Sequence, residues 1–122
     1  MASKFSTVLI LGVVLVFFAG CSSNQKPLML KKFGPTETRA GQIFNLQPGG
    51  VSAFWAETEN VTPNTVMVLN GVSLASAPSP DGKGITAAVP KNLYETPGEY
   101  PLLLLDTKTN QKSNELKFTV KP

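Results

Sequence analysis

The sequence predicts an all-β protein built as a sandwich of two sheets with about seven strands. Short apolar segments alternate with turn signals at intervals of about 8 to 12 residues, which is the strand spacing of such a sandwich. The ten prolines and ten glycines indicate many turns rather than long helices. Valine, threonine and phenylalanine are frequent, and these β-branched and aromatic residues favour strands.

Four strands are expected in the first half of the domain. They are, in order, Leu28–Phe33, Gln42–Leu46, Val51–Thr58 and Thr65–Leu69. Gly34-Pro35 ends the first of them, and the turn Pro48-Gly49-Gly50 precedes the third. A loop that contains proline, residues 61–64, leads into the fourth.

The second half begins with Asn70-Gly71, which is the strongest two-residue signal for a β-hairpin. Val72–Leu74 is its expected return arm, whereas Ala75–Lys83 and Pro90–Gly98 are expected to be loops. The remaining strands are Ile85–Val89, Tyr100–Asp106 and Glu115–Lys121, of which the last two form a hairpin.

The two C-terminal strands differ in their faces. Apolar and polar residues alternate in the last one: Leu116, Phe118 and Val120 against Glu115, Lys117, Thr119 and Lys121. The strand before it carries leucine on both faces, so that Leu103 and Leu105 point outward if Leu102 and Leu104 point inward. A covering loop or a register shift near Pro101 explains the outer pair, and the alternative is an apolar patch for a partner.

Aromatic residues supply the other candidate contacts. The third strand can place Trp55 in the core and Phe54 outside, or the reverse, and we favour a buried Trp55. Either residue, if exposed, could stack on a sugar ring or anchor a protein interface. Tyr94 lies in a loop between Pro90 and Pro97 and is a further candidate contact.

The N-terminal stretch predicts a membrane anchor. Lys4 precedes the apolar run Val8–Phe18, which is shorter than the roughly 20 apolar residues that span a bilayer. Ala19 and Gly20 are small, and Cys21 is the single cysteine of the chain. The sequence Phe17-Phe18-Ala19-Gly20-Cys21 resembles the lipobox of bacterial lipoproteins, with Phe18 where leucine is usual. The resemblance implies that residues 1–20 are a signal peptide and that Cys21 is acylated, with palmitate among its lipids.

The anchor defines the layout of the mature chain. Residues 21–27 form a polar tether of at most about 20 Å, and residues 28–122 form one domain. Three acyl chains, as bacterial lipoproteins carry, attach a protein durably to a membrane. Ser22 follows the cysteine where aspartate would resemble a retention signal for the inner membrane. We therefore expect the outer membrane in a Gram-negative cell, and the outer face of the plasma membrane in a cell with one membrane.

Four short motifs occur in a fixed order within residues 34–120: Gly34-Pro35, Thr65–Gly71, Ile85–Pro90 and Pro97–Tyr100. Together they resemble the IPT/TIG class of immunoglobulin-like domains. The resemblance implies an immunoglobulin-like sandwich with a role in binding, linking or spacing. It also implies a structural Tyr100, whose hydroxyl group caps the backbone where its strand begins.

The composition argues against catalysis. Histidine is absent, so no serine can be activated by a Ser-His pair, and one cysteine cannot form an internal disulfide. Glu57 and Glu59 share a strand face, which we interpret as a solvated edge rather than as an acid–base pair. We find no phosphate loop, no zinc or calcium motif and no implied cofactor. The net charge of +3 is too small to indicate nucleic acid.

These features predict a non-catalytic binding or assembly module that a lipid holds in the bacterial cell envelope. Its expected partners are the membrane, through Cys21, and an envelope protein. The alternative is a carbohydrate-binding lipoprotein that holds a cell-wall or surface glycan.

Overall fold

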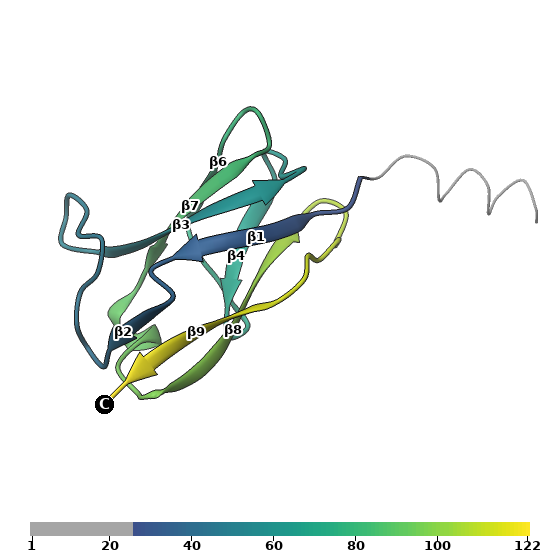
Figure 1. Ribbon diagram of the computed structural model, residues 1–122. Coiled ribbons are helices and arrows are strands. Elements are labelled where there is room, and N and C mark those ends of the chain that lie inside the picture. The colour runs from purple at the N-terminus through teal and green to yellow at the C-terminus, as the bar shows by residue number, and fades with distance from the viewer. Residues whose placement is uncertain (1–25) are drawn as a thin grey trace, which may run out of the picture.

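The computed structural model describes residues 26–122, which form two β-sheets packed face to face (Figure 1). The expected signal peptide, Cys21 and the first part of the tether lie outside the described residues. Within residues 26–122, no helix is long and apolar enough to cross a membrane. The predicted all-β sandwich is confirmed.

The strand order defines the topology. The four-stranded sheet has the order β1-β3-β7-β6, and its strands are β1 Met29–Gly34, β3 Ser52–Glu59, β7 Gly84–Val89 and β6 Ser76–Pro78. The five-stranded sheet has the order β2-β9-β8-β4-β5, and its strands are β2 Glu37–Arg39, β9 Leu116–Lys121, β8 Gly98–Asp106, β4 Thr65–Leu69 and β5 Val72–Ser73. Neighbouring strands are antiparallel except for β2 and β9. This order matches that of immunoglobulin-like sandwiches.

Local sequence accounts for most of these elements. The β4–β5 hairpin turns at Asn70 (φ 50°) and Gly71 (φ 79°), the backbone conformation of the predicted Asn-Gly turn. In β9, Phe118 and Val120 are buried and Lys117 and Lys121 are exposed, as the alternation predicted. The hydroxyl group of Tyr100 donates a hydrogen bond to the carbonyl of Thr96 (2.6 Å) and so caps the start of β8, as expected.

Two expectations about edge strands were wrong. Gln42–Leu46 is not a strand, and the second strand is instead β2, which pairs with β9. The segment Ala75–Lys83 is not only loop, because it contains β6, which pairs with β7. Both missed strands have three residues and lie at sheet edges. β2 depends on pairing with the distant β9, whereas β6 forms a hairpin with the next strand, β7, and neither has a clear apolar pattern of its own.

Phenylalanine rings from both sheets fill the core around Phe54. Its ring lies 4.8 Å from that of Phe118 in the opposite sheet, in an edge-to-face arrangement. The rings of Phe33 and Phe44 each lie 5.5 Å from it. Such aromatic pairs add about 0.5–1.5 kcal/mol each beyond the burial of their area. The sandwich is therefore centred on Phe54, and the prediction that Phe54 faces outward was wrong.

Asn114 closes one side of the sandwich. It precedes β9, and its side-chain amide accepts a hydrogen bond from the Leu30 N–H (2.9 Å) and donates one to the Leu30 carbonyl (3.0 Å). The side chain thus pairs with the backbone of β1, which is an edge strand of the four-stranded sheet. Satisfying these groups reduces the exposure of an unpaired edge.

Candidate functional site

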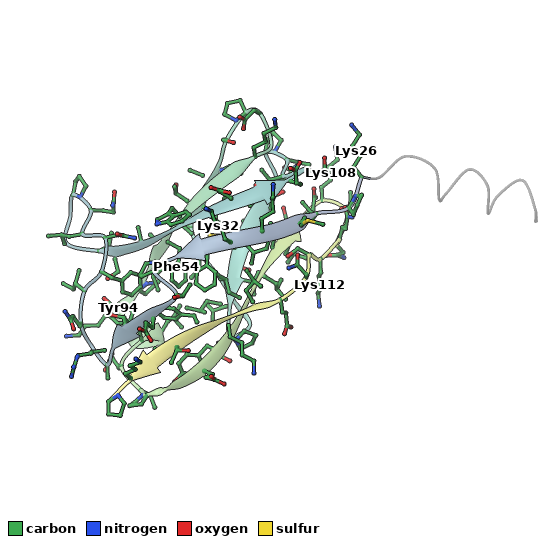
Figure 2. All side chains as sticks on the ribbon, in the orientation of Figure 1. Lys26, Lys32, Phe54, Tyr94, Lys108 and Lys112 are labelled. Atoms are coloured by element: carbon green, nitrogen blue, oxygen red, sulfur yellow. The ribbon has the colours of Figure 1, made fainter. Side chains whose placement is uncertain are left out.

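The structure separates the residues that were predicted to bind a partner. Phe54 and Tyr94 are 1% and 2% exposed, so their prediction as surface contacts was wrong. Figure 2 labels both of them within the body of the domain. Trp55 is 43% exposed, in the register that we had not favoured. Leu103 and Leu105 are half-buried on the outer face of the other sheet, so they do not form one patch with the aromatic residues.

The charges of β3 explain its register. Trp55 shares its strand face with Glu57 and Glu59, because alternate residues of a strand point the same way. Glu57 pairs with Lys32 (3.3 Å) and Glu59 with Lys31 (3.4 Å), both on the solvent side. The two glutamates are therefore solvated as predicted, but β3 lies between β1 and β7 and is not an edge strand. Burying Trp55 would have buried both carboxylates, which costs more than exposing one indole ring. The two glutamates were the signal that sequence reasoning missed.

Tyr94 fastens a long surface segment to the core. Its hydroxyl group lies 2.8 Å from the hydroxyl group of Ser52, which also accepts a hydrogen bond from the Phe44 N–H (3.0 Å). The carbonyl of Tyr94 accepts a hydrogen bond from the Gly41 N–H (2.8 Å). Its ring packs against Phe44 at 5.0 Å. Tyr94 is therefore a structural residue that positions the connection between β2 and β3.

That connection forms one wall of an open groove of about 730 Å³ on the outer face of β3 and β7. Leu46, Val51 and Trp55 border the groove, and each of these side chains is more than two-fifths exposed. Alanine residues from three strands or their flanks make up much of the remaining lining, including Ala53, Ala77 and Ala88. None of the residues between 26 and 122 that line it is charged. An uncharged groove with several exposed apolar side chains is typical of a binding surface.

The wall of the groove is held by its own hydrogen bonds. The Gln47 N–H donates to the Val51 carbonyl (2.9 Å), which closes a turn at residues 47–51. The side-chain amide of Asn45 donates to the Ala53 carbonyl (3.0 Å), and that of Gln47 donates to the Asn45 carbonyl (2.9 Å). The groove is thus preformed. The side-chain amides of Asn45 and Gln47 each donate one hydrogen bond to a backbone carbonyl of the protein itself.

The indole ring of Trp55 packs on a glycine of the neighbouring strand. It pairs with Gly34 across β1 and β3. A Cβ atom at position 34 would lie 2.5 Å from the Cε2 atom of the indole, closer than real Cβ contacts allow. The indole therefore lies against the bare backbone of Gly34, as an aromatic ring does when it covers a strand glycine.

A smaller hollow of about 330 Å³ lies on the opposite outer face, and Leu103 and Leu105 line it. Leu105 forms a β-bridge with Lys112, and Lys112 also borders the hollow. Segment 111–115 therefore runs beside β8 and encloses part of this face. This agrees with the explanation that a loop covers the outer leucines, and it makes the Trp55 groove the stronger candidate.

The described residues contain one well-buried carboxylate, Asp106, which is 5% exposed. Burial would raise its pKa, but hydrogen bonds from the Thr62 hydroxyl (2.8 Å) and from the N–H groups of Lys108 and Thr109 outweigh burial and lower the pKa. The carboxylate thus orders the turn after β8. Within residues 26–122, no group of three or more histidine, cysteine, aspartate or glutamate residues could hold a metal ion.

Comparison of the chain with models of protein families and with curated proteins found no match. The lipobox and the IPT/TIG resemblance therefore stay predictions from the residues themselves. The candidate binding site is defined by the geometry of this chain.

Proposed function

We propose that this chain is a non-catalytic binding module of the bacterial envelope, anchored by lipid on Cys21, that holds a protein partner in the Trp55 groove. The observation that supports the proposal most directly is the groove itself. It is preformed and uncharged, and Leu46, Val51 and Trp55 stay exposed around it. A partner that covers them would remove apolar surface from water, which is the main driving force of protein association.

The chemistry of the groove favours a protein over a sugar. Leu46 and Val51 are aliphatic and offer nothing to a hydroxyl group. The amide groups of Asn45 and Gln47 are partly used within the wall, whereas sugar recognition needs free polar groups around an aromatic ring. Tryptophan is enriched among the residues that dominate binding energy at protein interfaces.

The direction of the strands supports a tethered arrangement. The chain enters the domain next to Met29, which pairs with Glu59 at one end of β3, whereas Trp55 pairs with Gly34 at the other end of β1. Figure 1 shows the connection between β2 and β3 projecting at the end of the sandwich opposite the start of β1. A lipid on Cys21 would hold the first end at the membrane and leave the groove facing a partner. The IPT/TIG resemblance implies the same kind of binding role.

Site-specific photocrosslinking tests the protein partner. A photoreactive phenylalanine analogue replaces Trp55 in the full chain, expressed in its own cells, and light is applied to intact envelopes. We expect a discrete adduct with one protein. Val72 is the matched control, since it is apolar, 44% exposed and located in the other sheet. Adducts with lipid alone, or the same adducts from positions 55 and 72, would contradict the proposal.

Metabolic labelling tests the anchor. Cells that express the chain with tagged palmitate should yield a labelled protein that fractionates with membranes. The Cys21→Ser variant should lose the label and keep its signal peptide uncleaved. A mature protein that has an unmodified thiol at Cys21 would refute the anchor.

A second candidate function is glycan binding. The observation that favours it is the packing of the Trp55 ring on Gly34. A supported and exposed indole ring can stack on the apolar face of a sugar. Trp55 is the single tryptophan of the chain, so intrinsic fluorescence reports on this ring alone. Saturable changes in emission on titration with cell-wall glycans would favour this function over a protein partner, and a flat titration would reject it.

A further inference from the structure

The root of the tether is fastened to two loops at one end of the sandwich. The carbonyl of Lys26 accepts a hydrogen bond from the Gln111 side chain (3.2 Å), and the carbonyl of Pro27 accepts one from the Asn60 side chain (2.8 Å). These contacts join the start of the domain to the β3–β4 and β8–β9 loops. The described chain therefore enters the domain at a fixed point between these two loops.

Three lysines surround that point. Figure 2 shows Lys26, Lys108 and Lys112 at the end of the domain where the N-terminal chain leaves. All three are exposed. None of them forms a salt bridge within the part of the chain that the structure describes, where the bridged lysines are Lys31, Lys32, Lys117 and Lys121. We call these three residues the basic end.

The acidic groups near the basic end do not pair with its three lysines. Glu59 pairs with Lys31 (3.4 Å), and Asp81, in the turn beside Asn60, accepts hydrogen bonds from the Ser79 hydroxyl group and the Lys83 N–H. The carboxylate of Asp106 is buried and turned onto Thr62 and the backbone of the turn. Glu115 is exposed and borders the same hollow as Lys112 without forming a salt bridge to it. The basic end therefore presents ammonium groups outward while one neighbouring carboxylate is withdrawn.

We propose that the basic end rests on the anionic phospholipid headgroups of the leaflet that carries the anchor. This inference depends on the lipid anchor proposed above. Residues 21–27 span at most about 20 Å, so the tether lets the basic end come within one Debye length of the membrane, which is about 10 Å at 0.1 M salt. Lysine clusters beside a membrane are attracted to its negative surface potential. Tethering also raises the effective concentration of a patch too weak to bind alone.

The opposite end supplies a natural comparison. Three positively charged residues, Arg39, Lys91 and Lys121, lie at that end. Arg39 on β2 is opposite Lys121 on β9, near the C-terminus. Lys91 lies close to Gly41 in the same region. Charge alone does not distinguish the two ends of the domain. Distance from the membrane does, because screening removes the attraction of charges that lie farther than a Debye length from it.

Amine modification of the lipidated full chain tests the inference. The protein is placed in phosphatidylcholine vesicles and in vesicles that also contain phosphatidylglycerol, and mass spectrometry follows the labelling of each lysine. We expect labelling of Lys26, Lys108 and Lys112 to fall about fivefold in the anionic vesicles, and labelling of Lys91 to stay the same. Equal labelling in the two vesicles, or an equal fall at Lys91, would overturn the proposal.

Charge variants give an independent measurement. In anionic vesicles, hydrogen exchange of the amides in residues 107–114 should be slower than in neutral vesicles. Combined Lys26→Gln, Lys108→Gln and Lys112→Gln substitutions should abolish that difference. The control combines Arg39→Gln, Lys91→Gln and Lys121→Gln, which removes the same charge at the other end, and it should keep the difference. Retention in the first variant, or loss in both, would refute the role of the basic end.

Two further measurements distinguish failure of the lipid anchor from failure of the basic end. Inorganic phosphate is added to the neutral vesicles, and protection of the three lysines there would show a site for free anions and overturn the membrane assignment. Flotation of the vesicles is measured in the same samples. A chain that does not float refutes the anchor, whereas a chain that floats without protected lysines refutes only the basic end.

Discussion

At the scale of single residues, the adjacent aromatic residues Phe54 and Trp55 have opposite roles. Phe54 is surrounded by three phenylalanine rings, whereas Trp55 lies on Gly34 and faces the solvent. Two neighbours on one strand must point to opposite faces, so the environment of one determines that of the other. The exposure of Trp55 in the groove is in this sense a consequence of how the core is filled.

Alanine substitutions should separate these two roles. Phe54→Ala should lower the free energy of unfolding by about 3–5 kcal/mol, since it leaves a cavity among packed rings. Trp55→Ala should lower it by only about 1–2 kcal/mol, because much of the indole already faces water. Urea unfolding measures both. Equal losses would mean that Trp55 is a core residue and not a free contact.

Ser52 is the residue through which Tyr94 holds the wall of the groove. Ser52→Ala leaves the buried Phe44 N–H and the Tyr94 hydroxyl without their partner, which should cost about 1–3 kcal/mol of unfolding free energy. Ser73→Ala, at an exposed edge, is the control and should change it by less than about 0.5 kcal/mol. A shift of the urea midpoint no larger than that of the control would rule out this role.

Asp106 should make stability depend on pH. Its pKa in the folded state lies below the usual value of 3.8, so the folded state favours the charged form. The resulting stabilisation is present above about pH 4 and is lost as the pH falls through the folded pKa. Asp106→Asn should therefore lower stability at neutral pH and flatten its decline in acid. Thermal melts from pH 7 to pH 3 would measure this, with Glu115→Gln as an exposed control that should keep the wild-type decline.

At the scale of elements, side chains from the loops fix an edge strand and a long connection to the sandwich. The Asn114 side chain takes the place of a strand residue beside Leu30. Tyr94 holds the connection between β2 and β3 in place, because it forms hydrogen bonds with Ser52 and with the Gly41 N–H, which are far from it in the chain. These contacts fix loops that would otherwise lie loosely over the two sheets.

Removal of the Asn114 amide should loosen β1. We expect Asn114→Ala to lower the free energy of unfolding by about 0.5–1.5 kcal/mol and to speed hydrogen exchange at the Leu30 amide. Asn92→Ala, in the exposed 3₁₀ turn Lys91–Leu93 (η1), is the control. Unchanged exchange at Leu30 would show that the edge of β1 does not depend on this side chain.

At the scale of the whole molecule, the two ends of the sandwich have different surroundings. The chain leaves at the basic end, and the Trp55 groove lies toward the other end of β1. A short tether would then keep the basic end close to the lipid, and the end with the Trp55 groove would remain accessible to a partner. The two proposed contacts can form together because they use different parts of the surface.

A longer tether should uncouple them. Insertion of about ten glycine and serine residues between Asn24 and Gln25 adds a flexible segment with an average span of roughly 16–19 Å. This exceeds the Debye length, so protection of the lysines at the basic end should weaken. Crosslinking from position 55 should persist, since the groove is unchanged. Loss of the crosslink with intact lysine protection would contradict this division of the surface.

The sequence by itself determined the fold class, most strand segments, the Asn-Gly hairpin and the alternation of β9. These are local properties, because turn chemistry and a period of two act between neighbours in the chain. Only the tertiary structure decided the face of Trp55, the burial of Tyr94 and the existence of β2 and β6. A strand pattern permits two registers, and a strand of three residues such as β2 exists only because the distant β9 pairs with it. β6 is equally short and was recognised only from its pairing with β7. The candidate site depends on such long-range pairings, so Trp55 could be named from the sequence as a candidate while its surroundings could not.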